Sequence, residues 1–330
     1  MTINIGLVGA GFIGLLHARN LAASHHFTLS VVAEPNEAAA SRVAEATGAL
    51  VVSDWKELVD DPTLDAVLLA SPAELHADQV VAFAKAGKHI LCEKPLALNL
   101  EDADRAVAAA EEAGVLLQID FNRRLDPHHA VLRKAVEDGK IGAPLIVNII
   151  SRDPGLPGPG YKRAPGKMFM DTTIHDFDMA RFLAGSEITE VSALSAATID
   201  ELARAADDAD TTVITLRFAN GALGIIDNSR QALYGYDQRA EVLGTEGMAT
   251  CGNVEDTVTS VATASGFVAP PLPTFFPERY AESFRLVVDS FAKAITAGAK
   301  LPSDGKDGRA AIALALAAET SRRERRVVTL

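Results

Sequence analysis

The sequence predicts two domains: an α/β Rossmann domain with a doubly wound parallel sheet, then an α+β domain with an open, mostly antiparallel sheet. Apolar runs alternate with helical patterns over the first 120 residues, and a Gly-x-Gly-x-x-Gly motif joins the first run to the first helix. After about residue 143 strands follow one another with few helices between them. A chain of 330 residues has room for about two domains. We expect a dinucleotide-binding domain over residues 1–122 and a second domain over 123–330, with the last helices packing back on the first domain.

Continuous apolar runs are typical of parallel strands covered on both faces by helices, as right-handed crossovers require. Such runs are Ile3–Val8, Leu29–Ala33, Val67–Ala70, His89–Cys92 and Val115–Ile119. Helical spacing predicts helices over Phe12–Ala23, Glu37–Thr47, Ala73–Ala86 and Glu101–Ala113.

The second half predicts strands joined by turn signals such as Ala219-Asn220-Gly221. The expected strands are Val147–Ser151, Val191–Ala197, Thr212–Phe218, Leu223–Arg230 and Arg239–Gly244, and the expected helices are Thr172–Leu183, Tyr280–Ala297 and Asp307–Arg322. The uncharged run Thr257–Pro277 contains four prolines, so it predicts a strand and an irregular loop instead of a bilayer helix.

Composition excludes several classes of partner. The chain carries 31 basic and 44 acidic residues, a net charge of −13, so nucleic acid and anionic membrane surfaces would repel it. Two cysteines in a chain of this length argue against a secreted disulfide scaffold. Because Met1–Val8 also lacks a basic leader pattern, we expect a cytoplasmic protein.

The glycine motif predicts dinucleotide binding. Gly9 permits a tight turn, Gly11 lets the backbone approach a pyrophosphate, and Gly14 lets helix and strand pack closely, while Phe12 and Ile13 complete the motif at the helix start. Glu34 stands 20 residues after Gly14 at the end of the next strand, where a carboxylate accepts from a ribose 2′-OH and repels a 2′-phosphate. We therefore expect NAD as the cofactor. The alternatives are a plain strand–turn–helix and a Glu34 that only caps the following helix.

Two further clusters carry candidate chemistry. Lys94, in Cys92-Glu93-Lys94-Pro95, follows a strand and should face the cofactor crevice, where it could polarise a reacting hydroxyl; the alternative is a surface lysine. In a helix, Asp171, His175 and Asp178 share a stripe, and a carboxylate four residues before a histidine orients a general base. The alternatives there are a buried structural histidine or metal ligands, and since the other histidines and the cysteines lack ligand spacing we expect no metal.

Other polar positions could ring a polyhydroxylated substrate. They are Arg123, Arg124, Asp153 and the run Tyr234–Arg239. The loop Pro154–Tyr161 precedes the histidine helix and is either a lid or a loose connection.

These motifs together resemble the glucose–fructose oxidoreductase/inositol dehydrogenase family, and within it the inositol 2-dehydrogenase branch. The resemblance covers essentially the whole chain. It rests on the glycine motif and on these blocks: Cys92–Pro95, Phe121–Pro127, Ser151–Pro154, Thr173–Phe182 and Tyr234–Arg239.

The resemblance implies NAD-dependent oxidation of a ring hydroxyl of a small polyol to a ketone, with myo-inositol as the expected substrate. It also implies that the second domain binds the substrate and mediates assembly into a tetramer. It assigns Lys94, Asp171 and His175 to catalysis and implies a cis Lys94–Pro95 bond. It places Arg124, Asp153, Tyr161, Thr172 and Tyr234 or Tyr236 near the substrate, and Ser71, His76, Glu93 and Lys94 near the cofactor, beside Gly9, Gly11, Phe12, Ile13, Gly14 and Glu34.

Two residues depart from the family pattern. Asp120 and Lys167 stand where glycines are expected, and both would border the substrate pocket. This leaves open scyllo-inositol, D-chiro-inositol or an aldose as the substrate. A dinucleotide-sensing protein without turnover is a further alternative, although such a protein would be expected to lose the lysine or the histidine.

Overall fold

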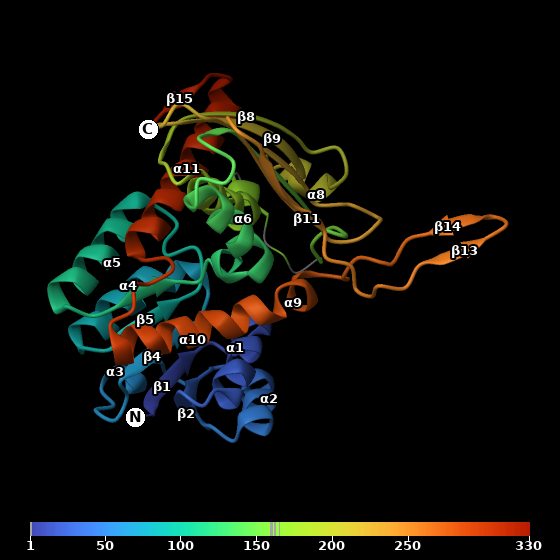
Figure 1. Ribbon diagram of the computed structural model, residues 1–330. Coiled ribbons are helices and arrows are strands. Elements are labelled where there is room, and N and C mark those ends of the chain that lie inside the picture. Colours follow the sequence, from blue (N-terminus) through green and yellow to red (C-terminus); the bar gives the residue numbers. More distant parts are fainter. Residues whose placement is uncertain (1, 159–160, 162, 165) are drawn as a thin grey trace. The chain divides into compact units, whose positions relative to one another are not determined.

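The computed structural model describes residues 2–158, 161, 163–164 and 166–330. The chain forms two compact units (Figure 1). The first consists of Met1–Leu125 and Glu282–Ile312, and the second of Asp126–Ala281 and Ala313–Leu330. The first unit is therefore built from two separate stretches of chain.

The first unit contains a parallel sheet of six strands in the order β3-β2-β1-β4-β5-β6. This order reverses between β1 and β4, as in doubly wound dinucleotide-binding folds. The strands are β1 (Ile3–Val8), β2 (Phe27–Ala33), β3 (Leu50–Val52), β4 (Ala66–Leu69), β5 (His89–Cys92) and β6 (Leu117–Ile119). The predicted Rossmann fold is confirmed, and β3 is a strand that the sequence patterns did not indicate.

Helices of the first unit begin and end at residues suited to those places. Asn36 and Asn99 accept hydrogen bonds at the starts of α2 and α5, and Gly48 and Gly114 end those helices with positive φ. The helices are α1 (Phe12–Ala23), α2 (Glu37–Thr47), α3 (Lys56–Val59), α4 (Ala73–Lys85), α5 (Leu100–Ala113), the 3₁₀ turn η1 (Asn122–Leu125), α10 (Ala281–Ala297) and the start of α11 (Gly305–Glu324).

The core of the first unit joins the N-terminal sheet to α10. Val287 and Val288 are buried in one cluster with residues of β1 and β2. The ring of Phe291 stacks on that of Phe27 with the centroids 6.3 Å apart. Burial of this apolar surface is the main stabilising term of the unit.

The second unit contains a seven-stranded sheet in the order β12-β11-β7-β10-β9-β8-β15. Most neighbours are antiparallel, as predicted, but β10 and β7 pair in parallel. The strands are β7 (Pro144–Arg152), β8 (Ile188–Ala196), β9 (Thr211–Phe218), β10 (Leu223–Ser229), β11 (Asp237–Gly244), β12 (Met248–Cys251) and β15 (Val328–Thr329).

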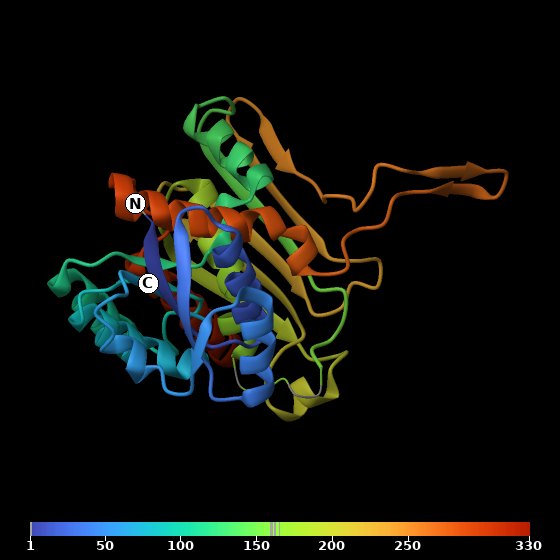
Figure 2. The same cartoon turned by 90° about the horizontal axis from the view of Figure 1, so that it is seen from below.

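One face of this sheet is covered by α7 (Ile174–Ala184) and the end of α11, whose apolar residues share a single core with the strands. The unit also contains α6 (Pro127–Glu137), which the sequence patterns did not predict, α8 (Glu201–Ala205) and α9 (Phe276–Arg279). The strand expected in Thr257–Pro277 is instead a hairpin of two short strands, β13 (Val261–Thr263) and β14 (Gly266–Val268). Both views show this hairpin extending away from the sheet (Figures 1 and 2).

Candidate active site

The glycine turn between β1 and α1 is shaped by close backbone contacts. Gly9 has a φ of +91°, and a Cβ there would lie 2.6 Å from the carbonyl oxygen of Ala70. A Cβ on Gly14 would lie under 3.0 Å from the carbonyl oxygen of Gly9. A Cβ on Gly11 would meet nothing within 4 Å. The turn therefore needs Gly9 and Gly14 for packing and leaves open space beside Gly11.

The first turn of α1 presents backbone N–H groups at the same place. Gly11 is the N-cap, makes no side-chain capping bond, and no acidic residue occupies the first turn. N–H groups of this kind, aided by the helix dipole, bind phosphate. Open space at Gly11 and uncapped amides from Phe12 onward fit the pyrophosphate of a dinucleotide.

Glu34 lies beside this turn. Its Oε2 accepts from the backbone N–H of Ala10 at 2.7 Å, and its Oε1 accepts from that of Asn36 at 2.8 Å. The helix cap of α2 is Asn36, whose side chain accepts from Ala39 at 3.0 Å. The N-cap of α2 is thus Asn36 and not Glu34, and the contact of the Glu34 carboxylate with a ribose stays a prediction.

The ends of β4 and β5 are joined through His76. Its Nδ1 lies 2.8 Å from the carbonyl oxygen of Pro95, and its Nε2 lies 2.9 Å from that of Ser71. Burial lowers the pKa of this imidazole. The Lys94–Pro95 bond is cis, so that prediction is confirmed. Lys94 itself follows β5 and is partly buried.

A buried cluster lies next to Lys94. Nε2 of His17 lies 2.8 Å from Glu93 Oε1 and 3.2 Å from Asp120 Oδ2. Burial disfavours the imidazolium, but the hydrogen bonds and charges of the two carboxylates outweigh it and raise the pKa of His17 to about 9. The sequence patterns did not point to His17, although it stands three residues after Gly14.

Arg124 is held by the first unit itself. Its guanidinium donates to the carbonyl oxygen of Pro302 at 2.8 Å and lies 2.9 Å from Asp307 Oδ1. Arg123 is buried. The predicted substrate contact of Arg124 stays a prediction.

In the second unit, Tyr161, Asp171 and Arg230 form one connected group. The hydroxyl of Tyr161 donates to Asp171 Oδ2 at 2.6 Å and accepts from Arg230 Nη2 at 2.9 Å. Arg230 also lies 3.6 Å from Asp171 and 3.8 Å from Asp153. Burial, together with the charge of Asp171, raises the pKa of the Tyr161 phenol. Three predicted residues thus meet around Arg230, which the sequence did not single out.

Cations surround the ring of Tyr161. Charged atoms of Arg230, Arg163 and Lys167 lie 5.1, 5.6 and 5.7 Å from its centroid. Arg163 donates to Asp200 at 2.6 Å and to the carbonyl oxygen of Pro157 at 3.0 Å. Part of the predicted lid, Pro159 and Gly160, lies outside the described residues, and its role as a lid stays a prediction.

The segment that carries His175 is helical with a local irregularity. The α-helix expected from Thr172 begins only at Ile174, because the π-helical turn η2 (Phe169–Thr173) precedes it and contains Asp171. Thr173 donates to Asn228 of β10 at 2.7 Å, and Asn228 donates to Asp176 at 2.9 Å. These buried bonds fix α7, and with it His175, against the sheet.

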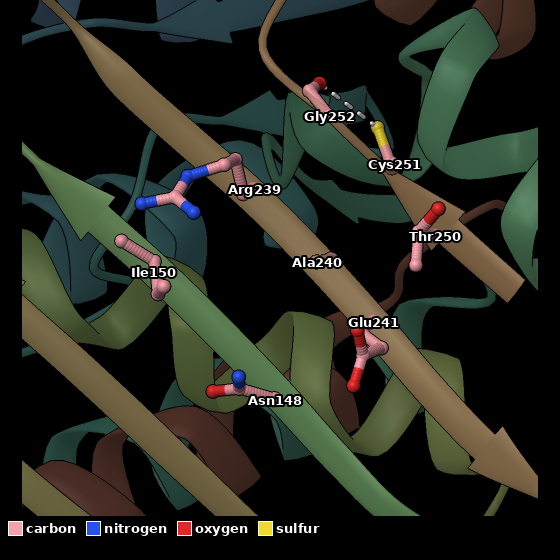
Figure 3. Close-up of a pocket in the computed structure, with 8 residues that line it drawn as sticks. All are labelled: Asn148, Ile150, Arg239, Ala240, Glu241, Thr250, Cys251 and Gly252. Atoms are coloured by element: carbon pink, nitrogen blue, oxygen red, sulfur yellow. Dashed lines mark hydrogen bonds between the residues drawn. The ribbon is translucent and has the colours of Figure 1, made fainter. Parts of the chain in front are cut away.

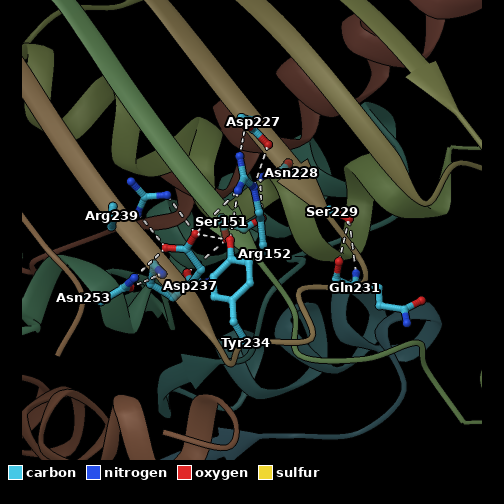
Figure 4. A network of polar contacts seen from close by, with 11 residues as sticks. Ser151, Arg152, Asp227, Asn228, Ser229, Gln231, Tyr234, Asp237, Arg239 and Asn253 are labelled. Carbon is cyan, nitrogen blue, oxygen red and sulfur yellow. Dashed lines mark hydrogen bonds and ion pairs between the residues drawn. The ribbon is translucent and has the colours of Figure 1, made fainter. Parts of the chain in front are cut away.

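Tyr234 and Tyr236 have different surroundings. The hydroxyl of Tyr234 donates to Asp237 at 2.7 Å and accepts from Arg152 at 3.0 Å, within the network of Figure 4. Tyr236 is 4% exposed, and its ring packs edge-on against Phe275. Of the two candidates, only Tyr234 presents surface to a ligand, with 59% of it exposed.

A separate hollow of about 200 Å³ lies on the sheet of the second unit (Figure 3). It is lined by Asn148, Ile150, Arg239, Ala240, Glu241, Thr250, Cys251 and Gly252. This lining includes none of the predicted catalytic residues, so it is distinct from the group around Tyr161.

Comparison with known proteins defines the class. Residues 3–121 match the oxidoreductase family with an NAD-binding Rossmann fold, and residues 129–250 match the GFO/IDH/MocA C-terminal domain. The chain belongs to the GFO/IDH/MocA family of oxidoreductases and is an NAD-binding enzyme of that family.

Relatives narrow the similarity further. A myo-inositol 2-dehydrogenase of Thermotoga maritima is 42% identical over 99% of this chain and 98% of its own length. An inositol 2-dehydrogenase of Rhizobium meliloti is 42% identical over the full length of both chains. The scyllo-inositol dehydrogenase of Lactobacillus casei, solved with NAD(H) and scyllo-inositol, superposes with a TM-score of 0.91 at 27% identity, over 100% of this chain and 99% of its own. Among the described residues, no helix has both the length and the apolar character to cross a bilayer.

Proposed function

We propose that this protein is an NAD-dependent inositol 2-dehydrogenase that oxidises a ring hydroxyl of myo-inositol to the ketone 2-keto-myo-inositol. The observation that carries the proposal is the group of Tyr161, Asp171 and Arg230 beside the histidine helix, in a chain with an intact glycine turn. The full-length similarity to two inositol 2-dehydrogenases supports the substrate.

His175 is the proposed general base that takes the proton of the reacting hydroxyl. An imidazole suits this task near neutral pH. Asp171 is proposed to stabilise the imidazolium that forms. Its carboxylate accepts a hydrogen bond from the Tyr161 hydroxyl at 2.6 Å and lies 3.6 Å from Arg230.

Lys94 is proposed to donate a hydrogen bond to the same oxygen. An ammonium group there stabilises the negative charge that develops as the proton leaves. The bound NAD supplies the hydride acceptor. The pyrophosphate would be held by the amides of Gly11–Gly14 and the adenosine ribose by Glu34, with Ser71, His76 and Glu93 lining the other half of the site.

Asp153, Arg124, Thr172 and Tyr234 are proposed to bind the remaining hydroxyls. Carboxylate and guanidinium groups recognise polyols through paired hydrogen bonds. Lys167, near the ring of Tyr161, and Asp120 distinguish this chain from the expected pattern, so scyllo-inositol, D-chiro-inositol and aldoses belong in the substrate test.

A substrate panel tests the proposal. Formation of NADH is followed at 340 nm with myo-, scyllo- and D-chiro-inositol and with glucose, and the highest kcat/KM is expected for myo-inositol. Preference for an aldose would replace inositol in the proposal. Absence of NADH formation with every polyol, in a protein that binds NAD, would contradict it and favour a dinucleotide sensor.

Replacement of the proposed base gives a second test. His175→Ala is expected to lower kcat at least about 100-fold, the low end of general-base effects. The Kd for NAD should stay unchanged, because the glycine turn belongs to the other unit. An activity loss below about tenfold would remove His175 from this role.

We further propose a cytoplasmic homotetramer that acts in inositol catabolism. Two free buried cysteines, Cys92 and Cys251, support a reducing compartment. Apolar side chains on the exposed face of the second sheet support subunit association: Leu194 is paired with Val213, and Leu223 with Ile146, all of them exposed. Light scattering of the purified protein tests the assembly.

A further inference from the structure

Three ionisable side chains meet inside the first unit. His17 comes from α1, Glu93 follows β5 and Asp120 follows β6, and they are 0%, 8% and 2% exposed. Buried charges are costly unless they are paired. We therefore expect a function for this cluster, which lies between α1 and the turn after β5 that carries Lys94.

The geometry ties these elements together. One ring nitrogen of His17 lies between the two carboxylates, 2.8 Å from Glu93 and 3.2 Å from Asp120. The other oxygen of Glu93 accepts from the backbone N–H of Lys94 at 3.2 Å. The ring of Phe284 from α10 packs edge-on against His17 with the centroids 5.7 Å apart. Solvent is thus kept from the cluster.

The distances within the cluster fit hydrogen bonds through a shared proton better than they fit coordination of a metal ion. The three groups offer ligand-type atoms within 4.8 Å of one another. However, the 2.8 Å separation of nitrogen and oxygen is a hydrogen-bond length. Tetrahedral ligands of zinc, at about 2.0–2.2 Å from the ion, lie about 3.3 Å apart.

The cluster carries a net negative charge at neutral pH. An imidazolium and two carboxylates sum to one negative charge. Burial and the charge of Glu93 raise the pKa of Asp120 to about 6, so Asp120 gains a proton and the cluster becomes neutral below that pH. The titratable groups around it are Lys94, which lies beside Glu93, the His76 imidazole of α4 and the Cys92 thiol of β5. Burial lowers the pKa of His76 and raises that of Cys92, so both stay neutral.

This charge lies at the half of the sheet that would bind the nicotinamide nucleotide. The two halves of a doubly wound sheet each bind one nucleotide, outside the carboxyl ends of the strands. Glu34, at the end of β2, marks the half for the adenosine. Glu93 and Asp120 lie at the carboxyl ends of β5 and β6, in the other half. The nicotinamide ring is positively charged when oxidised and neutral when reduced.

We propose that His17, Glu93 and Asp120 form a buried charge cluster that makes the first unit bind oxidised dinucleotide in preference to reduced, with Asp120 supplying the charge that sets this preference. A unit charge acting over about 10 Å at an effective dielectric constant of about 20 changes a binding equilibrium roughly tenfold. The inference rests on dinucleotide binding and not on the identity of the polyol, so binding measured without substrate tests it separately from the proposed function.

The experiment measures Kd for NAD⁺ and for NADH by calorimetry at about pH 8, where Asp120 is ionised in the wild type. Asp120→Asn keeps the side-chain volume and removes the charge. We expect the ratio Kd(NADH)/Kd(NAD⁺) to fall roughly tenfold in this variant. Asp78→Asn is the matched control, because Asp78 lies on α4 of the same unit with its side chain 67% exposed. The control should keep the wild-type ratio.

A second arm needs no variant. In the wild type the same ratio should fall between about pH 8 and pH 5, as Asp120 becomes protonated, whereas in Asp120→Asn it should stay level. A wild-type ratio that does not change with pH overturns the proposal, even if Asp120→Asn fails to fold. An unchanged ratio in folded Asp120→Asn overturns it as well. If the purified protein contained one equivalent of divalent metal, the cluster would hold a metal ion in place of the proton. The net negative charge assigned to the cluster would then be wrong.

Discussion

Gly11 and Gly14 lie three residues apart in the same turn, yet the structure gives them separate tasks. In Gly14→Ala the new methyl group would lie under 3.0 Å from the carbonyl oxygen of Gly9. Backbone cannot rotate away as a side chain can, so α1 must shift. Overpacking of this kind costs about 1–3 kcal/mol. In Gly11→Ala the methyl group meets nothing within 4 Å, and the backbone angles of −64° and −161° suit alanine.

Gly14→Ala should therefore lower thermal stability, whereas Gly11→Ala should weaken NAD binding. A unit of this size loses about 2–4 °C in Tm per kcal/mol, so Gly14→Ala should melt roughly 2–12 °C below the wild type. Gly11→Ala should melt as the wild type does. Its methyl group fills the space that a pyrophosphate needs, so the Kd for NAD should rise at least about tenfold, equivalent to about 1.4 kcal/mol.

Thermal melting without NAD and calorimetric titration with NAD measure the two effects independently. Equal loss of Tm in both variants would refute the packing argument. Wild-type affinity for NAD in Gly11→Ala would refute the assignment of that space to the cofactor.

Three other substitutions test contacts elsewhere in the protein. Glu34→Ala should lower the ratio of kcat/KM for NAD to kcat/KM for NADP by at least about tenfold, since a carboxylate that repels a 2′-phosphate is lost. A wild-type enzyme that prefers NADP would show that Glu34 does not determine the choice of cofactor. Tyr161→Phe should lower kcat about tenfold and leave the Kd for NAD unchanged, because a hydrogen bond to a charged group, worth about 1.5–3 kcal/mol, is removed from Asp171; an unchanged kcat would separate Asp171 from catalysis. Arg279→Met should destabilise the second unit by about 3–5 kcal/mol, since it leaves Asp126 buried without its guanidinium partner at 2.8 Å. Burial opposes ionisation of Asp126, but hydrogen bonds from His129 and Arg279 lower its pKa, so its contribution to stability is present above the ordinary aspartate pKa and is lost as the pH falls; denaturant unfolding against pH should show a weaker acid dependence in the variant.

Local patterns were sufficient to predict most of the first unit. Strands such as Ile3–Val8 are long and predominantly apolar, and the turn that follows has a glycine spacing that few other structures need. The strand Leu50–Val52 escaped prediction because three residues carry no period, and its pairing with β2 depends on tertiary contacts. The parallel pairing of β10 with β7 is likewise non-local, since β8 and β9 separate the two strands in sequence.

Only part of the candidate site could be predicted, because some of its contacts join residues far apart in the sequence. Asp171 and Tyr161 lie ten residues apart, and the family resemblance implied a role for both. Arg230 follows strand β10, far along the chain, and only the fold brings it to Tyr161. The π-helical turn before Ile174 gives no pattern in the sequence, so the start of the histidine helix was predicted too early.

The division of the first unit between two stretches of chain has a consequence for how the protein is made. Val287, Val288, Phe291 and Ala292 complete a core whose other buried members are synthesised before residue 92. A ribosome that has reached residue 125 has delivered every strand of the sheet but not the helix that covers its apolar face. The apolar face of the nascent sheet therefore stays uncovered until the strands of the second unit and then α10 have been synthesised. A gene fragment that ends at residue 125 should yield a polypeptide that aggregates and does not fold into an independent dinucleotide-binding domain.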